Sequence, residues 1–254
     1  GLPAHLYTDP AVFAEEKEKI FYRTWQYLGH VAMAPKSGNY FVGKVADQEI
    51  LVVRGADERL RAFYNVCQHR GHPLAKGSGR CKRFACPYHA WLYDLDGRLH
   101  SAPYGEEIPG FDPSAIRLAE VRLDTLAGLI FVNLDSSASP IRETFASVED
   151  ELRSAKLNIE DQTLVFEHPM PHDCNWKASV EGFSECYHCT PVHKYLTDSV
   201  IDPETYVLSA TGPVQRHYIR GRDPTLDQNL WFLWPNLAVG LYPIPGFGTT
   251  LCTR

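Results

Sequence analysis

Several features are missing from this sequence, and each absence narrows the function. No apolar run approaches the length of a membrane span, and the first residues have neither the basic nor the apolar stretch of a secretory signal. No basic patch stands out in a chain of net charge −6, which argues against nucleic acid as the main partner. We therefore expect a soluble, cytoplasmic protein that binds neither membranes nor nucleic acids.

Two cofactor motifs are missing as well. No G-x-G-x-x-G follows a strand-like segment, so the chain does not bind NAD(P)H in the usual way, and no plant-type ferredoxin run of four cysteines occurs. The seven cysteines are an odd number in a chain of 254 residues, and a cytoplasmic chain of this size does not need a disulfide framework. We predict free thiols.

The sequence does contain a pair of mixed cysteine and histidine motifs. Cys67-Gln-His69 is followed, after sixteen intervening residues, by Cys86-Pro-Tyr-His89. Together they supply two thiolates and two imidazoles, the ligands of the two irons in a Rieske [2Fe–2S] cluster. A zinc finger would place both cysteines before both histidines, so structural zinc is the lesser alternative. Cys81 lies close by, and we predict a buried apolar side chain there, not a ligand.

Short alternating segments surround these motifs. Thr8-Asp9-Pro10 predicts the start of a helix that ends near Trp25. Beyond it, the pattern predicts a small all-β module that carries the cluster at the tips of two hairpins. Its expected strands are 40–45, 50–53, 60–66, 83–85, 91–95 and 129–133.

A composition break at 135–140 separates a second domain. We expect helices over 140–155 and 175–189, a strand over 163–168, and antiparallel strands over 206–208, 215–219, 231–234 and 237–242. The chain then divides into an N-terminal helical segment at 1–37 that packs on the body, a cluster domain at 38–135 and a second domain at 136–254.

The second domain contains another candidate metal site. On a continuous helix, Glu181, Glu185 and His188 share one face. Thr190 precedes a proline and leaves the helical region, which lets His193 turn back beside His188. Two histidines make up most of the 2-His-1-carboxylate set that holds non-haem Fe(II).

Three other interpretations of this stretch stay open. Cys186 and Cys189 form a C-x-x-C that, with His193, has the ligand types of a zinc site. Glu185-Cys-Tyr-His188 is also a Glu-x-x-His of the kind found in di-iron bundles, although such a bundle needs two of these motifs. In the third interpretation these residues are polar members of the core.

The motifs named above resemble those of the Rieske-type non-haem iron oxygenases, in their terminal oxygenase (alpha) subunits. The similar stretches are Cys67-Gln-His69-Arg-Gly, Cys86-Pro-Tyr-His89-Ala-Trp91, Asn175-Trp-Lys, Glu185-Cys-Tyr-His188 and His193. Respiratory Rieske proteins are less similar, because they carry a further cysteine in each loop. The resemblance implies an α+β fold, with a small all-β Rieske iron-sulfur domain and a helix-grip catalytic domain, an antiparallel sheet with helices.

The resemblance also implies roles for particular residues. Cys67, His69, Cys86 and His89 bind the cluster, and His188 and His193 bind a mononuclear Fe(II). Glu185 links that iron to His89 of the partner subunit, which implies a homotrimer. A separate NAD(P)H-dependent reductase, with or without a ferredoxin, supplies the electrons.

Two departures from the family pattern stand out. The family supplies a carboxylate ligand well after the second histidine, yet no Asp or Glu follows Asp227, so we expect the native polypeptide to extend beyond Arg254. Gly182 stands where many relatives have Asn.

The bridge Glu185 resembles that of oxygenases acting on carnitine, choline or betaines. Aromatic residues late in the chain either belong to the core, as strand aromatics commonly do, or form a cage for a quaternary ammonium group. They are Trp231, Phe232, Trp234, Tyr242 and Phe247. We therefore expect hydroxylation or N-demethylation of such a compound. The alternatives are an arene-hydroxylating oxygenase, a Rieske electron carrier with an inactive second domain, and a zinc-stabilised binding protein.

Overall fold

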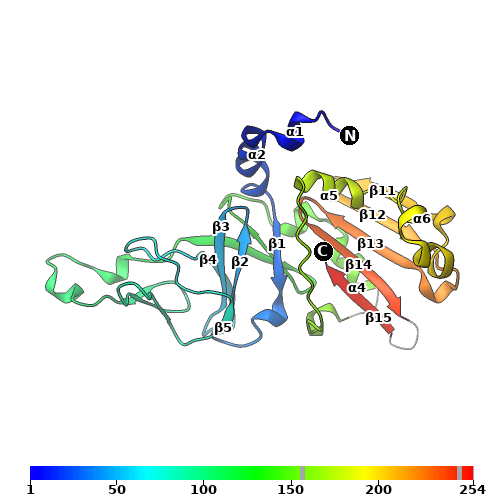
Figure 1. The fold of residues 1–254 in the computed structure, drawn as a ribbon. Helices are drawn as coiled ribbons and strands as arrows, with labels where there is room; N and C mark the ends of the chain where they lie inside the picture. The colour runs from blue at the N-terminus through cyan, green and yellow to red at the C-terminus, as the bar shows by residue number, and fades with distance from the viewer. Residues whose placement is uncertain (155–157, 245–247, 254) are drawn as a thin grey trace. The chain divides into compact units, whose positions relative to one another are not determined.

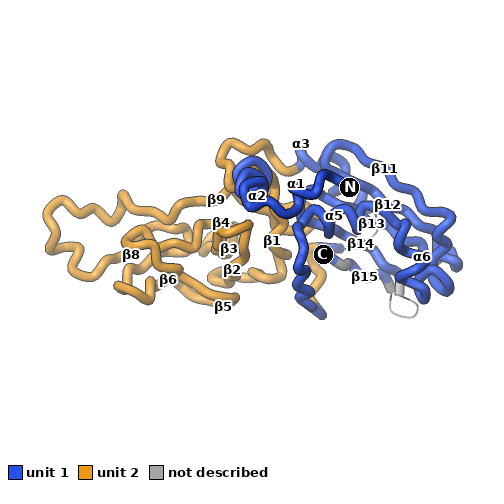
Figure 2. Tube along the Cα trace, turned by 45° about the horizontal axis from the view of Figure 1, so that its top comes forward, with its two compact units in different colours: residues 1–20, 142–159, 165–254 blue, residues 21–141, 160–164 orange. Residues whose placement is uncertain are grey.

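The computed structural model describes residues 1–154, 158–244 and 248–253, which form two compact units. Unit 1 comprises residues 1–20, 142–159 and 165–254, and unit 2 comprises residues 21–141 and 160–164 (Figure 2). None of the described helices is long and apolar enough to cross a membrane.

Unit 2 is built on a seven-stranded sheet with the order β1-β10-β9-β4-β3-β2-β5 (Figure 1). The strands are β1 (Gln26–His30), β2 (Asn39–Val45), β3 (Gln48–Arg54), β4 (Leu60–Tyr64), β5 (Ser78–Arg80), β9 (Glu120–Leu126) and β10 (Leu129–Asn133). Strand β3 reads Ile-Leu-Val-Val over residues 50–53, all fully buried, because both of its faces are covered. Burial of these side chains holds the unit together.

A second, three-stranded sheet in unit 2 carries the later metal-binding motif. It contains β6 (Phe84–Ala85), β7 (Leu92–Tyr93) and β8 (Leu99–Ser101). Strands β6 and β7 pair as a hairpin, with Phe84 opposite Tyr93, and residues 86–91 form its tip. The first motif is different. It follows β4, which pairs with β3 and β9, so the prediction that both motifs lie at hairpin tips is wrong for residues 67–69.

Unit 1 begins with short helices at the N-terminus. Asp9 caps α2 (Pro10–Glu16) by accepting a hydrogen bond from the Ala11 amide at 2.8 Å, as the sequence predicts. The helical segment continues as a π-helical turn over Lys17–Phe21 and ends there, before Trp25. It stops early because residues from Gln26 onward pair with β10 and must be extended.

The other α-helices are α1 (His5–Thr8), α3 (Ile141–Thr144), α4 (Val148–Ser154), α5 (Trp176–Phe183) and α6 (Cys189–Val192). Short 3₁₀ or π-helical turns occur at Val31–Met33, Gly105–Glu107, Pro113–Ala115, Ile159–Asp161, Leu196–Val200, Pro203–Thr205 and Pro224–Leu226. The helix predicted over 140–155 is divided in two, because Ser147 has a positive φ of 69° that a helix does not accept.

The core of unit 1 is a five-stranded antiparallel sheet. Its strands lie in chain order, β11 (Val207–Thr211), β12 (Val214–Ile219), β13 (Gln228–Leu233), β14 (Leu237–Ile244) and β15 (Gly248–Thr253). Side chains alternate between the two faces. Arg216 and its cross-strand neighbour Trp231 both contact Glu151 of α4, so α4 covers that face. Gln215, His217 and Phe232 lie on the opposite face.

Two further predictions about the second half of the chain are wrong. No strand forms over 163–168, where the side chains of Leu164, Val165 and Phe166 are 66%, 90% and 78% exposed and no described strand pairs with them. The helix predicted over 175–189 ends at Phe183, because the chain turns at residues 184–188 before α6 begins.

Candidate metal centres

The two cluster motifs adopt the same turn. In each, the cysteine amide donates to the carbonyl five residues later, and the cysteine carbonyl accepts from the amide four residues later. The four distances are 2.9 Å for Cys67 to His72, 2.9 Å for Gly71 to Cys67, 2.8 Å for Cys86 to Trp91 and 2.9 Å for Ala90 to Cys86. The residue before the last of each turn has a positive φ, 71° at Gly71 and 57° at Ala90. Two copies of one turn present equivalent ligands, as a cluster with two irons requires.

The two cysteines lie at the inner side of these turns. Cys67 and Cys86 are 2% and 3% exposed. Burial raises the pKa of the Cys67 thiol against the lowering effect of a hydrogen bond with Tyr93, and the Cys86 thiol is close enough to raise it further. The Tyr93 hydroxyl lies 3.3 Å from the Cys67 sulfur and accepts a hydrogen bond from the Gln68 amide at 3.0 Å. Burial raises the pKa of Tyr93, so its O–H stays available to donate to a thiolate.

The two histidines lie together at the outer side. The rings of His69 and His89 are 4.7 Å apart, and Trp91 stacks on His69 at 4.8 Å with an angle of 9°. Burial, and then the charges of His69 and Arg70, lower the pKa of His89, which favours the neutral ring that binds metal. Two buried thiols with two adjacent imidazoles fit the donor set of a Rieske cluster, with Cys₂ on one iron and His₂ on the other.

Two residues that the sequence analysis missed support this site. Tyr93 hydrogen-bonds one cysteine, as described above. Asn65 is 1% exposed and closes the first loop, since its side chain accepts from the amides of Leu74 and Ala75 and donates to the Ala75 carbonyl and to Glu49. Cys81 is partly buried against the core of this unit, as predicted.

The second candidate site follows α5 in unit 1. Asn175 caps this helix by accepting from the Lys177 amide at 3.1 Å. Trp176 donates to Glu16 of α2 at 2.8 Å, and Lys177 forms an ion pair with the same carboxylate at 2.5 Å. These contacts fix the first turn of the helix whose far end leads to the predicted iron ligands.

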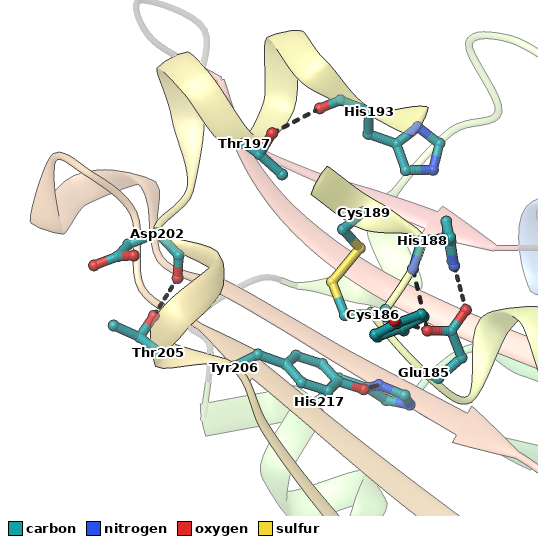
Figure 3. The surroundings of a disulfide bond; sticks show 11 residues. Glu185, Cys186, His188, Cys189, His193, Thr197, Asp202, Thr205, Tyr206 and His217 are labelled. Carbon is teal, nitrogen blue, oxygen red and sulfur yellow. Dashed lines mark hydrogen bonds and ion pairs between the residues drawn. A yellow bond between two sulfur atoms is a disulfide. The ribbon is translucent and has the colours of Figure 1, made fainter. Parts of the chain in front are cut away.

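Glu185 and His188 lie in the turn after α5, and His193 follows α6, which brings its ring beside that of His188 (Figure 3). Glu185 Oε1 lies 2.5 Å from His188 Nδ1, and the hydrogen bond to His188 lowers the pKa of Glu185. The rings of His188 and His193 are 5.2 Å apart. Because Nδ1 of His188 is engaged by Glu185, Nε2 is the nitrogen left for a metal. The pairing predicted from a helical face is thus formed by a turn, and Glu181 instead accepts a hydrogen bond from Tyr7.

A disulfide bond joins Cys186 and Cys189, on either side of His188 in the same segment. Their Cα atoms are 5.1 Å apart. The prediction of free thiols is therefore wrong for this pair, because the turn at 184–188 brings the two within disulfide reach. The disulfide also removes the thiolates that the zinc interpretation of this C-x-x-C requires.

No third ligand joins the two histidines among the residues that the structure describes. Within those residues, no group of three or more His, Cys, Asp or Glu side chains is arranged to hold a single metal ion. For the cluster this is expected, since each iron takes only two protein ligands. For His188 and His193 it leaves the carboxylate of the 2-His-1-carboxylate set unassigned.

A cavity of about 350 Å³ lies at the β11–β12 turn of unit 1, lined by Ala210, Gly212, Pro213, Gln215, Phe232 and Trp234. Phe232 and Trp234, two members of the predicted aromatic cage, line it together. Trp231 does not belong to this cage, because its indole donates to Glu151 on the other face of the sheet. Phe247 lies outside the described residues. The ring of Phe183, at the end of α5, lies 5.8 Å from that of Phe232, so one lining residue contacts the helix that precedes the metal-binding segment.

Two protein families match the chain, one in each half. The Rieske [2Fe-2S] domain matches residues 24–112, and the ring hydroxylating alpha subunit (catalytic domain) matches residues 159–247. The first match includes all four predicted cluster ligands, and the second includes Glu185, His188 and His193.

The chain is similar throughout to characterised oxygenase subunits. It is 33% identical to the carnitine monooxygenase oxygenase subunit of Escherichia coli K12, over 98% of this chain and 70% of that protein. It is 37% identical to the glycine betaine monooxygenase oxygenase subunit of Chromohalobacter salexigens, over 80% of this chain and 45% of that protein.

A solved structure has the same fold. A quaternary ammonium Rieske monooxygenase in complex with L-carnitine superposes with a TM-score of 0.86 at 32% identity, over 99% of this chain and 73% of the other. The α+β fold expected from the sequence is confirmed. The chain belongs to the Rieske non-haem iron oxygenases, as an oxygenase subunit whose cofactors are a Rieske [2Fe–2S] cluster and a mononuclear non-haem iron.

Proposed function

We propose that this oxygenase hydroxylates a quaternary ammonium compound, with N-demethylation as the outcome when an N-methyl carbon is attacked. The observation that carries the proposal is the aromatic cavity beside the metal-binding segment. Phe232 and Trp234 line it, and Phe183 connects it to the turn that contains Glu185. The similarity to enzymes named for carnitine and glycine betaine supports the same substrate class.

The cavity has the chemistry that a quaternary ammonium group needs. Such a cation cannot donate a hydrogen bond, so it is recognised by the electron-rich faces of aromatic rings. A tryptophan and a phenylalanine at one cavity suit this role, because cation–π attraction is strongest for tryptophan.

The cofactors supply electrons and O₂ activation when bound, and the protein positions everything else. We propose that Cys67, Cys86, His69 and His89 hold the cluster, and that His188 and His193 hold the mononuclear iron through Nε2 of His188. Glu185 orients the His188 ring by its hydrogen bond to Nδ1. A carboxylate ligand completes the iron site.

We further propose that Glu185 faces His89 of the partner subunit in a homotrimer, so that electrons pass between subunits. Inter-subunit electron transfer has been described for a quaternary ammonium Rieske monooxygenase that is 31% identical to this chain. A separate NAD(P)H-dependent reductase supplies the electrons in the cytoplasm, since this sequence has no dinucleotide fingerprint. We propose an N-terminal helical segment at 1–37, a Rieske domain at 38–135 and a catalytic domain at 136–254.

A substrate panel tests the proposal. Iron-loaded protein, a compatible reductase and NADH are mixed with glycine betaine, carnitine, choline or naphthalene, and O₂ consumption is followed together with formaldehyde release. We expect at least one quaternary ammonium compound to stimulate O₂ consumption with product formation, while naphthalene does not. Product from naphthalene alone would instead establish the arene-hydroxylating alternative.

A further inference from the structure

One region of unit 1 contains unpartnered polar atoms to which neither metal binding nor recognition of a cation by aromatic rings gives a role. Among the described residues, three buried side-chain polar atoms make no hydrogen bond, namely Ser184 Oγ, Gln215 Oε1 and His217 Nε2. Buried polar atoms are nearly always paired, because an unpaired one has lost its hydrogen bonds to water without a replacement. Three such atoms in one region therefore indicate a place where a ligand supplies the missing partners.

These atoms are close to the metal-binding segment. Gln215 and His217 lie two residues apart on β12 and so share one face of the sheet. Phe183 packs on the His217 ring at 5.0 Å, and Ser184 follows Phe183 directly. Gln215 and Phe232 line the cavity described above. The unpartnered atoms thus extend from the cavity wall towards Glu185.

His217 is the most constrained of the three. It is 5% exposed, and its Nδ1 lies 2.7 Å from the Tyr206 hydroxyl, which leaves only Nε2 to meet a ligand. Figure 3 shows the Tyr206 ring directed at His217. Burial, and then the negative charge of Glu185, raise the pKa of Tyr206, while burial lowers the pKa of His217. A neutral tyrosine that donates to Nδ1 leaves the proton of a neutral imidazole on Nε2.

We propose that His217 is a substrate-positioning residue whose Nε2–H donates a hydrogen bond to an oxygen of the quaternary ammonium substrate. This inference rests on the proposed function and extends it. The aromatic rings select the cation, and His217 selects substrates that carry a carboxylate or hydroxyl oxygen. Binding at two points fixes which methyl or methylene carbon faces the iron ligands.

Binding measurements separate this hydrogen bond from the general fit of the cation. Iron-loaded wild-type protein and His217→Phe are titrated by calorimetry with glycine betaine, choline and tetramethylammonium. These probes share the cationic head, but they carry a carboxylate, a hydroxyl and no oxygen, respectively. Phenylalanine keeps an aromatic ring and removes the donor. We expect it to weaken binding of an oxygen-bearing probe about tenfold and to leave tetramethylammonium binding unchanged within a factor of about two.

Two further variants make the test specific. His217→Gln, which places an amide N–H near the position of Nε2, should recover affinity to within about threefold of wild type. Tyr206→Phe keeps His217 but removes the hydrogen bond to Nδ1 that holds its proton on Nε2. This variant should weaken the binding of the oxygen-bearing probes only. It also serves as the second probe of the inference if His217→Phe does not fold. Tyr218→Phe, on the opposite face of β12, is the matched control and should bind all three probes like wild type.

The outcomes distinguish this inference from the proposed function. If glycine betaine and choline differ in their response to His217→Phe, the more affected probe identifies the oxygen that His217 recognises. Equal weakening of all three probes, or no change in any, would contradict a hydrogen bond to substrate and leave the proposed function intact. If wild-type protein binds none of the quaternary ammonium probes, both proposals are wrong.

Discussion

The ion pair between Glu16 and Lys177 offers the most quantitative test of how the iron site is supported. The two side chains are each only 12% exposed, and the same carboxylate also accepts from the Trp176 indole at 2.8 Å. Glu16→Leu leaves an ammonium and an indole N–H without their acceptor in a mostly buried place. Breaking a buried pair in this way costs about 3–5 kcal/mol of stability. Because both side chains keep some exposure to solvent, we expect a loss at the lower end of this range, about 3 kcal/mol.

The expected loss is large enough to measure by thermal unfolding. At about 2–4 °C per kcal/mol for a chain of this size, Glu16→Leu should lower Tm by about 6–12 °C. Circular dichroism follows the helices, and the visible absorption of the cluster is recorded in parallel. The neighbouring residue provides a matched control. Glu15 pairs with Lys19 on the surface, where the side chains are 60% and 71% exposed, so Glu15→Leu should leave Tm nearly unchanged.

A double variant tests whether the charge pair itself is responsible. Replacing both partners, Glu16→Leu with Lys177→Met, removes the stranded charge and should recover more than half of the lost stability. The result that would refute this reasoning is simple additivity, in which the double variant is less stable than wild type by the sum of the two single losses. That result would mean that the two side chains do not interact and that α2 does not fix the first turn of α5.

Three further predictions concern single residues. Glu185→Ala should keep the cluster and most of the mononuclear iron yet turn over about 100-fold more slowly, and an iron-free variant with an intact cluster would instead make Glu185 a metal ligand. Cys86→Ser should lose the visible spectrum of the cluster, while Cys81→Ser should keep it, and the opposite pattern would contradict the ligand assignment. Burial opposes ionisation of Glu151, but the hydrogen bonds from Arg216 and other groups lower its pKa to about 2. Its contribution is therefore present above the unfolded pKa of about 4.5 and lost towards pH 2, so the stability difference between wild type and Glu151→Gln should shrink as the pH falls from 5 to 3 in denaturant titrations.

The parts of the protein that sequence patterns predict are those encoded locally. The two cluster motifs each place a cysteine and a histidine within a few residues, so one short turn brings them together wherever the sheets lie. The sequence predicts the strand Leu129–Asn133 at its observed ends, because the apolar run and the flanking turns are both local signals.

The parts that sequence patterns miss depend on contacts distant in sequence. Strands β1 and β5 have weak patterns of their own and form through pairing with β10 and β2, which lie far from them in sequence. His217 is an isolated histidine in the sequence, and its place beside Phe183 follows only from the register of β12. The break in the helix after Phe183 has only a weak local signal, Gly182, because Ser184 to His188 contains no Gly or Pro. One error could have been avoided. Side chains alternate between the two faces of a strand, so the adjacent residues Trp231 and Phe232 of β13 cannot both line the same cavity.

Electron paramagnetic resonance can test directly whether the protein holds two iron centres and binds a quaternary ammonium substrate at the mononuclear one. The reduced, iron-loaded protein is treated with nitric oxide, a paramagnetic probe of mononuclear Fe(II). Two signals are expected, one from a mixed Cys/His [2Fe–2S] cluster and one from the nitric oxide adduct of the mononuclear iron. Glycine betaine, carnitine or choline should change the second signal, because the proposed cation site lies beside His188 and His193, while naphthalene should not. An adduct signal that responds to naphthalene and to none of the quaternary ammonium compounds would contradict the proposal that a quaternary ammonium substrate binds beside the mononuclear iron.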